Sequence, residues 1–400
     1  MIKKVVGIAV TILLLAYLIT LILHVSAHDD QYLWDFRTHR EAGKILAAGS
    51  NPYDADTLFP KARTRFLYTY PPVTLFFYRL FAIPEYNTAF HIFLIGKFIL
   101  LVGLIYFWQR EFLKEGGKIL FYVFCLMAFN STIFLDMIAG NINLVQQALL
   151  WLGFSFYIRG RYTLFCLFTL IAASFKITPV FFLILMLLPD DKNKYKYFFG
   201  AGAIFLSYLL IQYLIVPELF TGFIKNALEV VGEPGGVVPS TNKLIAGIFE
   251  LVSKLTGMTM PQAFQSAIFI IIAAAVVFFS YKACLRLKQA QFDNRAMLEV
   301  FVVCLVYALI HPRFKDYGYI LLLVPSFYII KNIHYTKITP FLFILFIMSN
   351  RMMLPIVSSI YDVVWAFFPL VVAYCVWGIY LYEIFSPNDE KLLERAPSHN

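Results

Sequence analysis

Residues 87–108, NTAFHIFLIGKFILLVGLIYFW, form an apolar run about as long as an α-helix needs to cross ~30 Å of hydrocarbon. A helix is required there because lipid offers no hydrogen-bond partners to backbone groups. Similar runs recur along the chain, in which 60% of the residues are hydrophobic and 14% are charged. A soluble domain of this length would have too little polar surface. The sequence therefore predicts an all-α polytopic membrane protein.

The apolar runs predict about twelve transmembrane helices. We expect one domain over residues 1–385 and a short cytoplasmic tail at 386–400. The expected spans are 5–24, 87–108, 119–136, 142–158, 162–176, 177–188, 197–216, 262–281, 297–310, 317–330, 338–349 and about 360–382.

Orientation follows from the short loops, since Lys and Arg concentrate on the cytoplasmic side. One threading gathers the basic loops there, among them those with Arg159 and Lys192. Both termini are then cytoplasmic, and the protein is expected in the plasma membrane. Two large loops, about 25–86 and 217–261, face the extracytoplasmic side.

Three stretches depart from simple spans. Pro71–Phe81 is apolar but only about a dozen residues long, which suits a re-entrant or interfacial helix. Residues 36–48 have helical spacing, so a second interfacial helix is expected in the first outer loop, ending near Gly49. The apolar stretch 162–188 is interrupted at Lys176-Ile177-Thr178-Pro179, because proline breaks a helix.

Charge and cysteine content argue against two other classes of protein. The 33 Lys and Arg exceed the 24 Asp and Glu, but the basic residues are spread over short loops and form no nucleic-acid-binding patch. The five cysteines fall inside apolar runs, without the spacing of metal ligands or of a disulfide framework. We therefore expect no metal site and no cofactor.

Asp35, in Trp34-Asp35-Phe36-Arg37, opens the helical stretch of the first outer loop. Two roles fit this residue. At the expected N-cap, its carboxylate would accept hydrogen bonds from the first N–H groups of the helix. At the boundary between water and lipid, it would also serve as a general base. The pattern leaves both roles open.

Asparagine side chains gather at the outer start of the span at 142–158, in Gly140-Asn141-Ile142-Asn143. A helix N-terminus presents unpaired N–H groups and suits an anionic or hydroxylated ligand. Alternatively, Asn141 caps the helix and the amides bond neighbouring helices.

Cations occur at three informative places. Lys176, at the helix break, either meets an anion or extends toward the headgroups. Lys97 falls in mid-span, where a wet cavity would explain it, and no partner is evident. The outer segment with His311, Arg313 and Lys315 suits a phosphate group, although such a segment also binds lipid phosphate unspecifically.

An ordered series of short motifs resembles glycosyltransferase family 87, the GT-C mannosyltransferases that use polyprenyl-phosphate-mannose. The resembling pieces are Asp35-Phe36, Ala42, Gly49-Ser50-Asn51-Pro52-Tyr53, Tyr70-Pro71-Pro72, Gly140-Asn141-Ile142-Asn143 and Lys176-Ile177-Thr178-Pro179. The resemblance implies a GT-C fold with an extracytoplasmic cavity. It also implies an acid in the first outer loop that deprotonates the acceptor hydroxyl, a role that falls on Asp35.

From these observations we expect an inverting hexosyltransferase, with mannose as the expected sugar. The donor is a polyprenyl-phosphate-linked sugar, the acceptor is a lipid or glycan hydroxyl, and Asp35 is the base. Residues expected to bind the substrates are Lys176, Arg313, Lys315, His311, Asn141, Asn143, His39 and Asn242.

Two alternatives stay open. A polytopic transporter or lipid flippase would also have about twelve spans, and the mid-span Lys97 favours it. Asp54-Ala55-Asp56 resembles the acid pair that binds a metal and a nucleotide diphosphate in soluble glycosyltransferases. The other reading of this acid pair is a solvated turn.

Overall fold

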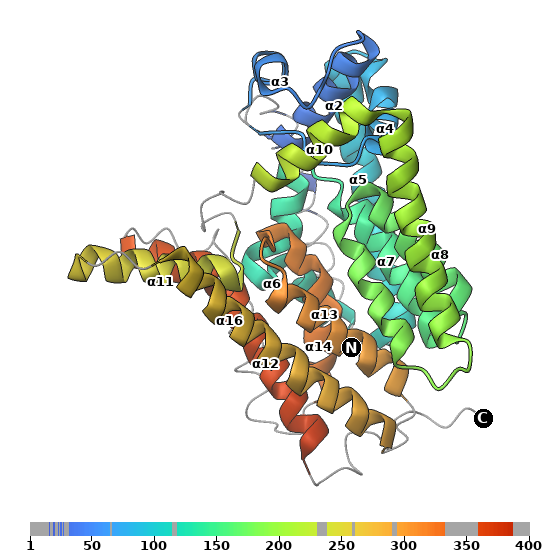
Figure 1. Cartoon of the computed structure of the whole chain (residues 1–400), viewed down its shortest axis with the longest axis vertical. Coiled ribbons are helices and arrows are strands. Elements are labelled where there is room, and N and C mark those ends of the chain that lie inside the picture. The colour runs from blue at the N-terminus through green and yellow to red at the C-terminus, as the bar shows by residue number, and fades with distance from the viewer. Residues whose placement is uncertain are drawn as a thin grey trace. The chain divides into compact units, whose positions relative to one another are not determined.

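The computed structural model describes residues 32–64, 66–113, 118–229, 238–257, 261–289, 294–332 and 359–386, with a few isolated positions before residue 32. Within these ranges the regular structure is helical and no strand occurs (Figure 1). The expected spans at 5–24 and 338–349 and the expected tail at 386–400 lie almost entirely outside the described residues.

The chain divides into two compact units, Met1–Val123 with Phe134–Gly232, and Phe124–Ile133 with Glu233–Asn400. The first unit contains α2 (Trp34–Ala47), α3 (Ala55–Ala62), α4 (Val73–Ala82), α5 (Tyr86–Trp108), η1 (Gln109–Leu113), α7 (Asn143–Ile158), α8 (Tyr162–Phe175), η2 (Thr178–Leu187), α9 (Lys194–Ile215) and α10 (Pro217–Glu229). The second contains α11 (Thr241–Thr256), α12 (Gln262–Gln289), α13 (Arg295–Ile310), η4 (Asp316–Leu322), α14 (Leu323–Asn332) and α16 (Ser359–Phe385). Helix α6 (Lys118–Ala139) contributes residues to both units.

Five helical segments in the described ranges are long and apolar enough to cross a membrane. They are Tyr86–Leu113, Ile119–Ala139, Lys194–Ile215, Gln262–Gln289 and Ala366–Phe385. The described part of the chain thus has the structure of an all-α membrane protein. The expected number of about twelve spans stays a prediction, because several of the expected segments form helices too short for this criterion.

The two expected irregularities of the apolar pattern occur in the first unit. Helix α4 has ten residues, or about 15 Å at the rise of an α-helix, which is half of a hydrocarbon core. Helix α8 ends before Lys176, whose backbone is extended, and Pro179 lies in the first turn of η2. Because η2 is a 3₁₀ helix, its ten residues reach about 20 Å, farther than an α-helix of equal length.

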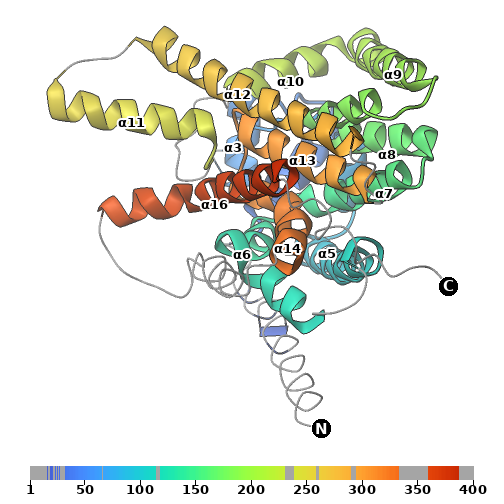
Figure 2. The same cartoon turned by 90° about the horizontal axis from the view of Figure 1, so that it is seen from below.

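Within the first unit, α7, α8 and α9 lie side by side, and α2 packs on α4 (Figures 1 and 2). Gly43 permits the close approach of α2 and α4. A Cβ atom at Gly43 would lie 3.0 Å from backbone atoms of both Tyr78 and Arg79, so a larger residue would push the two helices apart. In the second unit, α12, α13 and α16 pack against one another (Figure 2).

Candidate active site

Asp35 lies inside the first turn of α2 and is not its N-cap. The N-cap is Leu33, in a left-handed conformation with φ of 51°, and Leu33 N donates to Ile138 O at 2.7 Å. Of the two roles left open for Asp35, that of the N-cap is therefore wrong. The helix begins two residues earlier than the capping preference indicates, because the chain turns at Leu33 through backbone hydrogen bonds, without a bond from a side chain.

The carboxylate of Asp35 is held by Asn141, which lies 106 residues further along the chain. Asn141 Nδ2 donates to Asp35 Oδ2 at 2.6 Å and to Tyr70 OH at 2.9 Å. Asn141 Oδ1 accepts from the backbone N of Asn143 at 3.0 Å. Since the oxygen must face this N–H, the amide nitrogen must face Asp35 and Tyr70. The N-cap of α7 is Ile142, so Asn141 is not the predicted cap of this helix, but its side chain accepts from the first N–H of α7 and donates to the carboxylate of Asp35 at once.

The turn before Asn141 requires a glycine. Gly140 has φ of +68°, and a Cβ atom there would lie 2.9 Å from side-chain atoms of both Leu33 and Phe36. This contact brings the turn between α6 and α7 against the start of α2. Gly140 therefore sets the distance between Asn141 and Asp35.

Lys97, for which the sequence indicated no partner, forms a buried ion pair. Its Nζ atom lies 2.7 Å from Asp136 Oδ2 and donates to the carbonyl oxygens of Asp136 at 2.6 Å and Asn141 at 2.9 Å. The paired carboxylate and the two carbonyls explain a cation in mid-span without a wet cavity. The observation that favoured a transporter is thereby accounted for.

Tyr70 joins this cluster to two further candidates. Lys176 Nζ lies 5.9 Å from the centroid of the Tyr70 ring, within the range of a cation–π interaction. The ring of His39 lies edge-on to that of Tyr70, at 4.6 Å between centroids. His39 is buried, whereas Asp35 and Lys176 are partly exposed. The fold thus brings four predicted site residues around Tyr70: Asp35, Asn141, His39 and Lys176.

The Tyr70 segment is itself anchored at several points. Tyr53 OH donates to Tyr70 O at 2.6 Å, and Asn226 Nδ2 donates to the backbone oxygens of Tyr53 at 2.9 Å and Tyr68 at 3.1 Å. Burial raises the pKa of Tyr53 above its ordinary value. Helix α10, which carries Asn226, thereby holds the segment that presents Tyr70.

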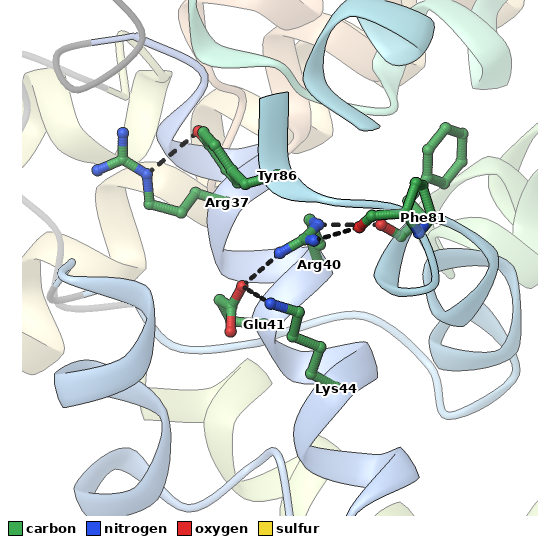
Figure 3. Close-up of polar contacts among 7 residues, drawn as sticks. Arg37, Arg40, Glu41, Lys44, Phe81 and Tyr86 are labelled. Atoms are coloured by element: carbon green, nitrogen blue, oxygen red, sulfur yellow. Dashed lines mark hydrogen bonds and ion pairs between the residues drawn. The ribbon is translucent and has the colours of Figure 1, made fainter. Parts of the chain in front are cut away.

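An arginine-rich face of α2 fixes the helix that carries Asp35 (Figure 3). Arg40, 2% exposed, donates to Phe81 O at 2.9 Å and Pro84 O at 2.7 Å. Its guanidinium also pairs with Glu41 at 2.8 Å. Arg37 Nε donates to Tyr86 OH at 3.3 Å at the start of α5. These bonds hold α2 against the segment that joins α4 to α5.

The remaining predicted substrate-binding residues lie in the second unit. His311 ends α13, and its Nδ1 accepts from Arg313 N at 3.1 Å. Lys315 Nζ lies 5.8 Å from the centroid of the Tyr317 ring. Asn242 lies in the first turn of α11, next to the N-cap Ser240, and all four predicted residues are partly exposed.

The acid pair at Asp54 and Asp56 has a structural explanation. Asp54 is the N-cap of α3, where it accepts from Asp56 N at 3.3 Å and from Thr57 Oγ1 at 2.5 Å. The bond from Thr57 lowers the pKa of Asp54. Over the described ranges, no group of three or more His, Cys, Asp or Glu side chains could hold a metal ion.

Sequence reasoning missed two members of the cluster. The sequence marks Tyr70 only as part of a motif and indicates no role for Asp136. A signal for Asp136 existed, since a Lys in mid-span calls for an acidic partner at similar depth. The hydroxyl contact of Tyr70 had no comparable signal.

Comparison with known proteins defines the class. The sequence model of a glycosyltransferase family matches residues 68–312, more than half of the 400-residue chain. With its membrane-spanning helices, the protein is a membrane glycosyltransferase. It belongs to glycosyltransferase family 87. No curated protein and no solved structure matches the chain. The matched range includes Tyr70, Asn141 and Lys176, whereas Asp35 precedes it and Arg313 follows it.

Proposed function

We propose that the protein transfers a hexose, with mannose as the expected sugar, from a polyprenyl-phosphate carrier to a hydroxyl of a lipid or glycan acceptor. The observation that carries the proposal is the partly exposed carboxylate of Asp35, held at 2.6 Å by Asn141, which also donates to Tyr70 OH, while Lys176 Nζ lies 5.9 Å from the centroid of the Tyr70 ring. A general base suits activation of the acceptor hydroxyl, and a cation suits stabilisation of the leaving phosphate.

The reaction is a single displacement. Asp35 takes the proton of the acceptor hydroxyl, and the resulting oxygen attacks the anomeric carbon. The bond from that carbon to the phosphate oxygen breaks, and its electron pair leaves with the phosphate. One carboxylate suffices on the acceptor side, because cations stabilise the leaving group. Because the reaction is a single displacement, the configuration at the anomeric carbon is inverted.

Lys176 is the proposed cation of the first unit for the leaving phosphate. For Arg313 or Lys315, with His311, the same role stays a prediction from the sequence. Asn143, His39 and Asn242 are proposed to contribute polar contacts to the sugar and the acceptor. A monophosphate carries less charge than a nucleotide diphosphate, so these cations neutralise it without a divalent ion.

The site is proposed to open on the extracytoplasmic side of the plasma membrane. The support is the distribution of Lys and Arg, which places the basic short loops and both termini in the cytoplasm. Nucleotide sugars are made in the cytoplasm, whereas a lipid carrier delivers its sugar within the bilayer. The proposed orientation thus favours a lipid-linked donor.

The test is donor use by the purified protein. Transfer should require a polyprenyl-phosphate sugar, should fail with a nucleotide sugar, and should persist in EDTA because no metal takes part. In sealed vesicles of known orientation, only acceptor on the extracytoplasmic face should be modified. Radiolabelled product, separated by thin-layer chromatography, gives the readout.

The control is a variant in which Asp54 and Asp56 are both changed to Ala. Because Asp54 acts as a helix cap, this variant should keep its activity with the lipid donor. Activity that required a nucleotide sugar and a divalent ion, and was lost in this variant, would overturn the proposed donor.

A further inference from the structure

The ion pair of Lys97 and Asp136 has no part in the proposed chemistry, but it adjoins the residue that holds the base. Lys97 lies in the middle of α5 with 3% of its side chain exposed, and Asp136 on α6 has 0% exposed. Removing two charges from water is costly, and well-packed apolar residues of similar volume are often as stable. Stability alone therefore does not account for this pair.

The geometry shows what the ammonium of Lys97 does. An ammonium has three N–H donors, and three oxygens lie within 3 Å of Lys97 Nζ: Asp136 Oδ2 at 2.7 Å, Asp136 O at 2.6 Å and Asn141 O at 2.9 Å. Two of its donors bond to the carbonyl oxygens, and its charge pairs with the carboxylate of Asp136. Lys97 thus ties residue 136 to residue 141 across the turn between α6 and α7.

Asn141 passes this constraint to the base. Its backbone oxygen is bonded to Lys97, and its side chain is oriented by the N–H of Asn143. The amide nitrogen then has two N–H groups, directed to Asp35 Oδ2 and to Tyr70 OH. Asn141 thus contacts both the buried ion pair and the carboxylate of Asp35.

We infer that Lys97 and Asp136 are positioning residues for the reaction: they fix the backbone of Asn141, and Asn141 fixes the carboxylate of Asp35. The inference rests on the proposed function, since it takes Asp35 to be the base. Misplacement of a reacting group by about 1 Å costs up to roughly 10²-fold in rate. Loss of the pair should therefore affect turnover more than substrate binding.

The test is the double variant Lys97→Met/Asp136→Leu in the full-length protein. It removes both charges together, so Tm in detergent should stay close to wild type. We expect kcat with the polyprenyl-phosphate sugar to fall by about 10- to 100-fold, with KM for the donor nearly unchanged. If the pair had only a structural role, a double variant with the Tm of the wild type would also have the kcat of the wild type.

The matched control removes another charged pair that does not touch this cluster. Arg295 and Glu299 on α13 lie 2.7 Å apart and are 21% and 3% exposed. The variant Arg295→Met/Glu299→Leu should keep the kcat of the wild type. A similar loss of kcat in this control would overturn the inference, because any lost ion pair would then impair the enzyme.

Combination with Asp35→Asn separates the two claims. If the pair acts through Asp35, adding Lys97→Met/Asp136→Leu to Asp35→Asn should cause no further loss of the residual activity. Normal kcat in the folded double variant, together with a strongly lowered kcat in Asp35→Asn, would overturn the positioning role alone. Near-normal turnover of Asp35→Asn would instead overturn the proposed base.

A third variant tests the inference if the double variant folds poorly. Asn141→Leu leaves the ion pair in place and removes the side-chain bonds of Asn141 to Asp35, to Tyr70 and to the N–H of Asn143. It should lower kcat by a similar factor. Wild-type kcat in Asn141→Leu would overturn the inference, since the proposed path passes through this side chain.

Discussion

Asp35→Asn should lower turnover by about 10²- to 10⁴-fold, the usual contribution of a positioned general base. The introduced carboxamide cannot take up the proton of the acceptor, but its oxygen can still accept the bond from Asn141 that Asp35 Oδ2 accepts at 2.6 Å. Because packing and this contact survive, Tm and KM for the donor should stay close to wild type. Steady-state kinetics and thermal unfolding in detergent give the three quantities.

Asp56→Asn is the matched control, because it changes a second carboxylate of the same loop, in the first turn of α3. It should leave kcat unchanged. Near-normal turnover in Asp35→Asn would contradict the proposed role of Asp35, and a large loss in Asp56→Asn would point to chemistry at the acid pair instead.

Lys97→Met alone should be among the most destabilising single substitutions in the first unit, at about 3–5 kcal/mol. It leaves the carboxylate of Asp136, which is 0% exposed, without its cation. The cost arises from the unpaired buried charge, so it should be largely recovered when Asp136→Leu is added. The measurement is the loss of Tm and of folded yield in detergent.

Lys44→Met provides the comparison for this prediction. Lys44 is 43% exposed and lies 3.2 Å from Glu41, so water screens the pair and its loss should cost about 0–1 kcal/mol. Equal effects of Lys97→Met and Lys44→Met would contradict the structural role of the buried pair.

The main features of the fold could be predicted from local pattern. Long apolar runs correspond to helices such as α5, α9 and α12, and Pro179 marks the break between α8 and η2. The start of α2 could not be predicted in the same way. Leu is a poor N-cap residue by preference, and Leu33 acts here only because its N–H bonds to Ile138 O, far away in the sequence.

The candidate site was predictable in its residue types and not in its contacts. Asp35 and Asn141 stood out as polar groups at helix starts, but 106 residues separate them and no local pattern encodes their contact. The partner of Lys97 could not be predicted for the same reason, since Asp136 lies on another helix. The contacts depend on the turn at Gly140, whose close approach to α2 appears only in three dimensions.

The most direct test of the central claim, a single displacement assisted by Asp35, is the anomeric configuration of the product. NMR of the glycoside formed from a polyprenyl-phosphate sugar of known configuration should show the opposite configuration at the anomeric carbon. Retention would contradict the account, because it requires a covalent intermediate on a nucleophile and a second displacement, as in retaining glycosidases.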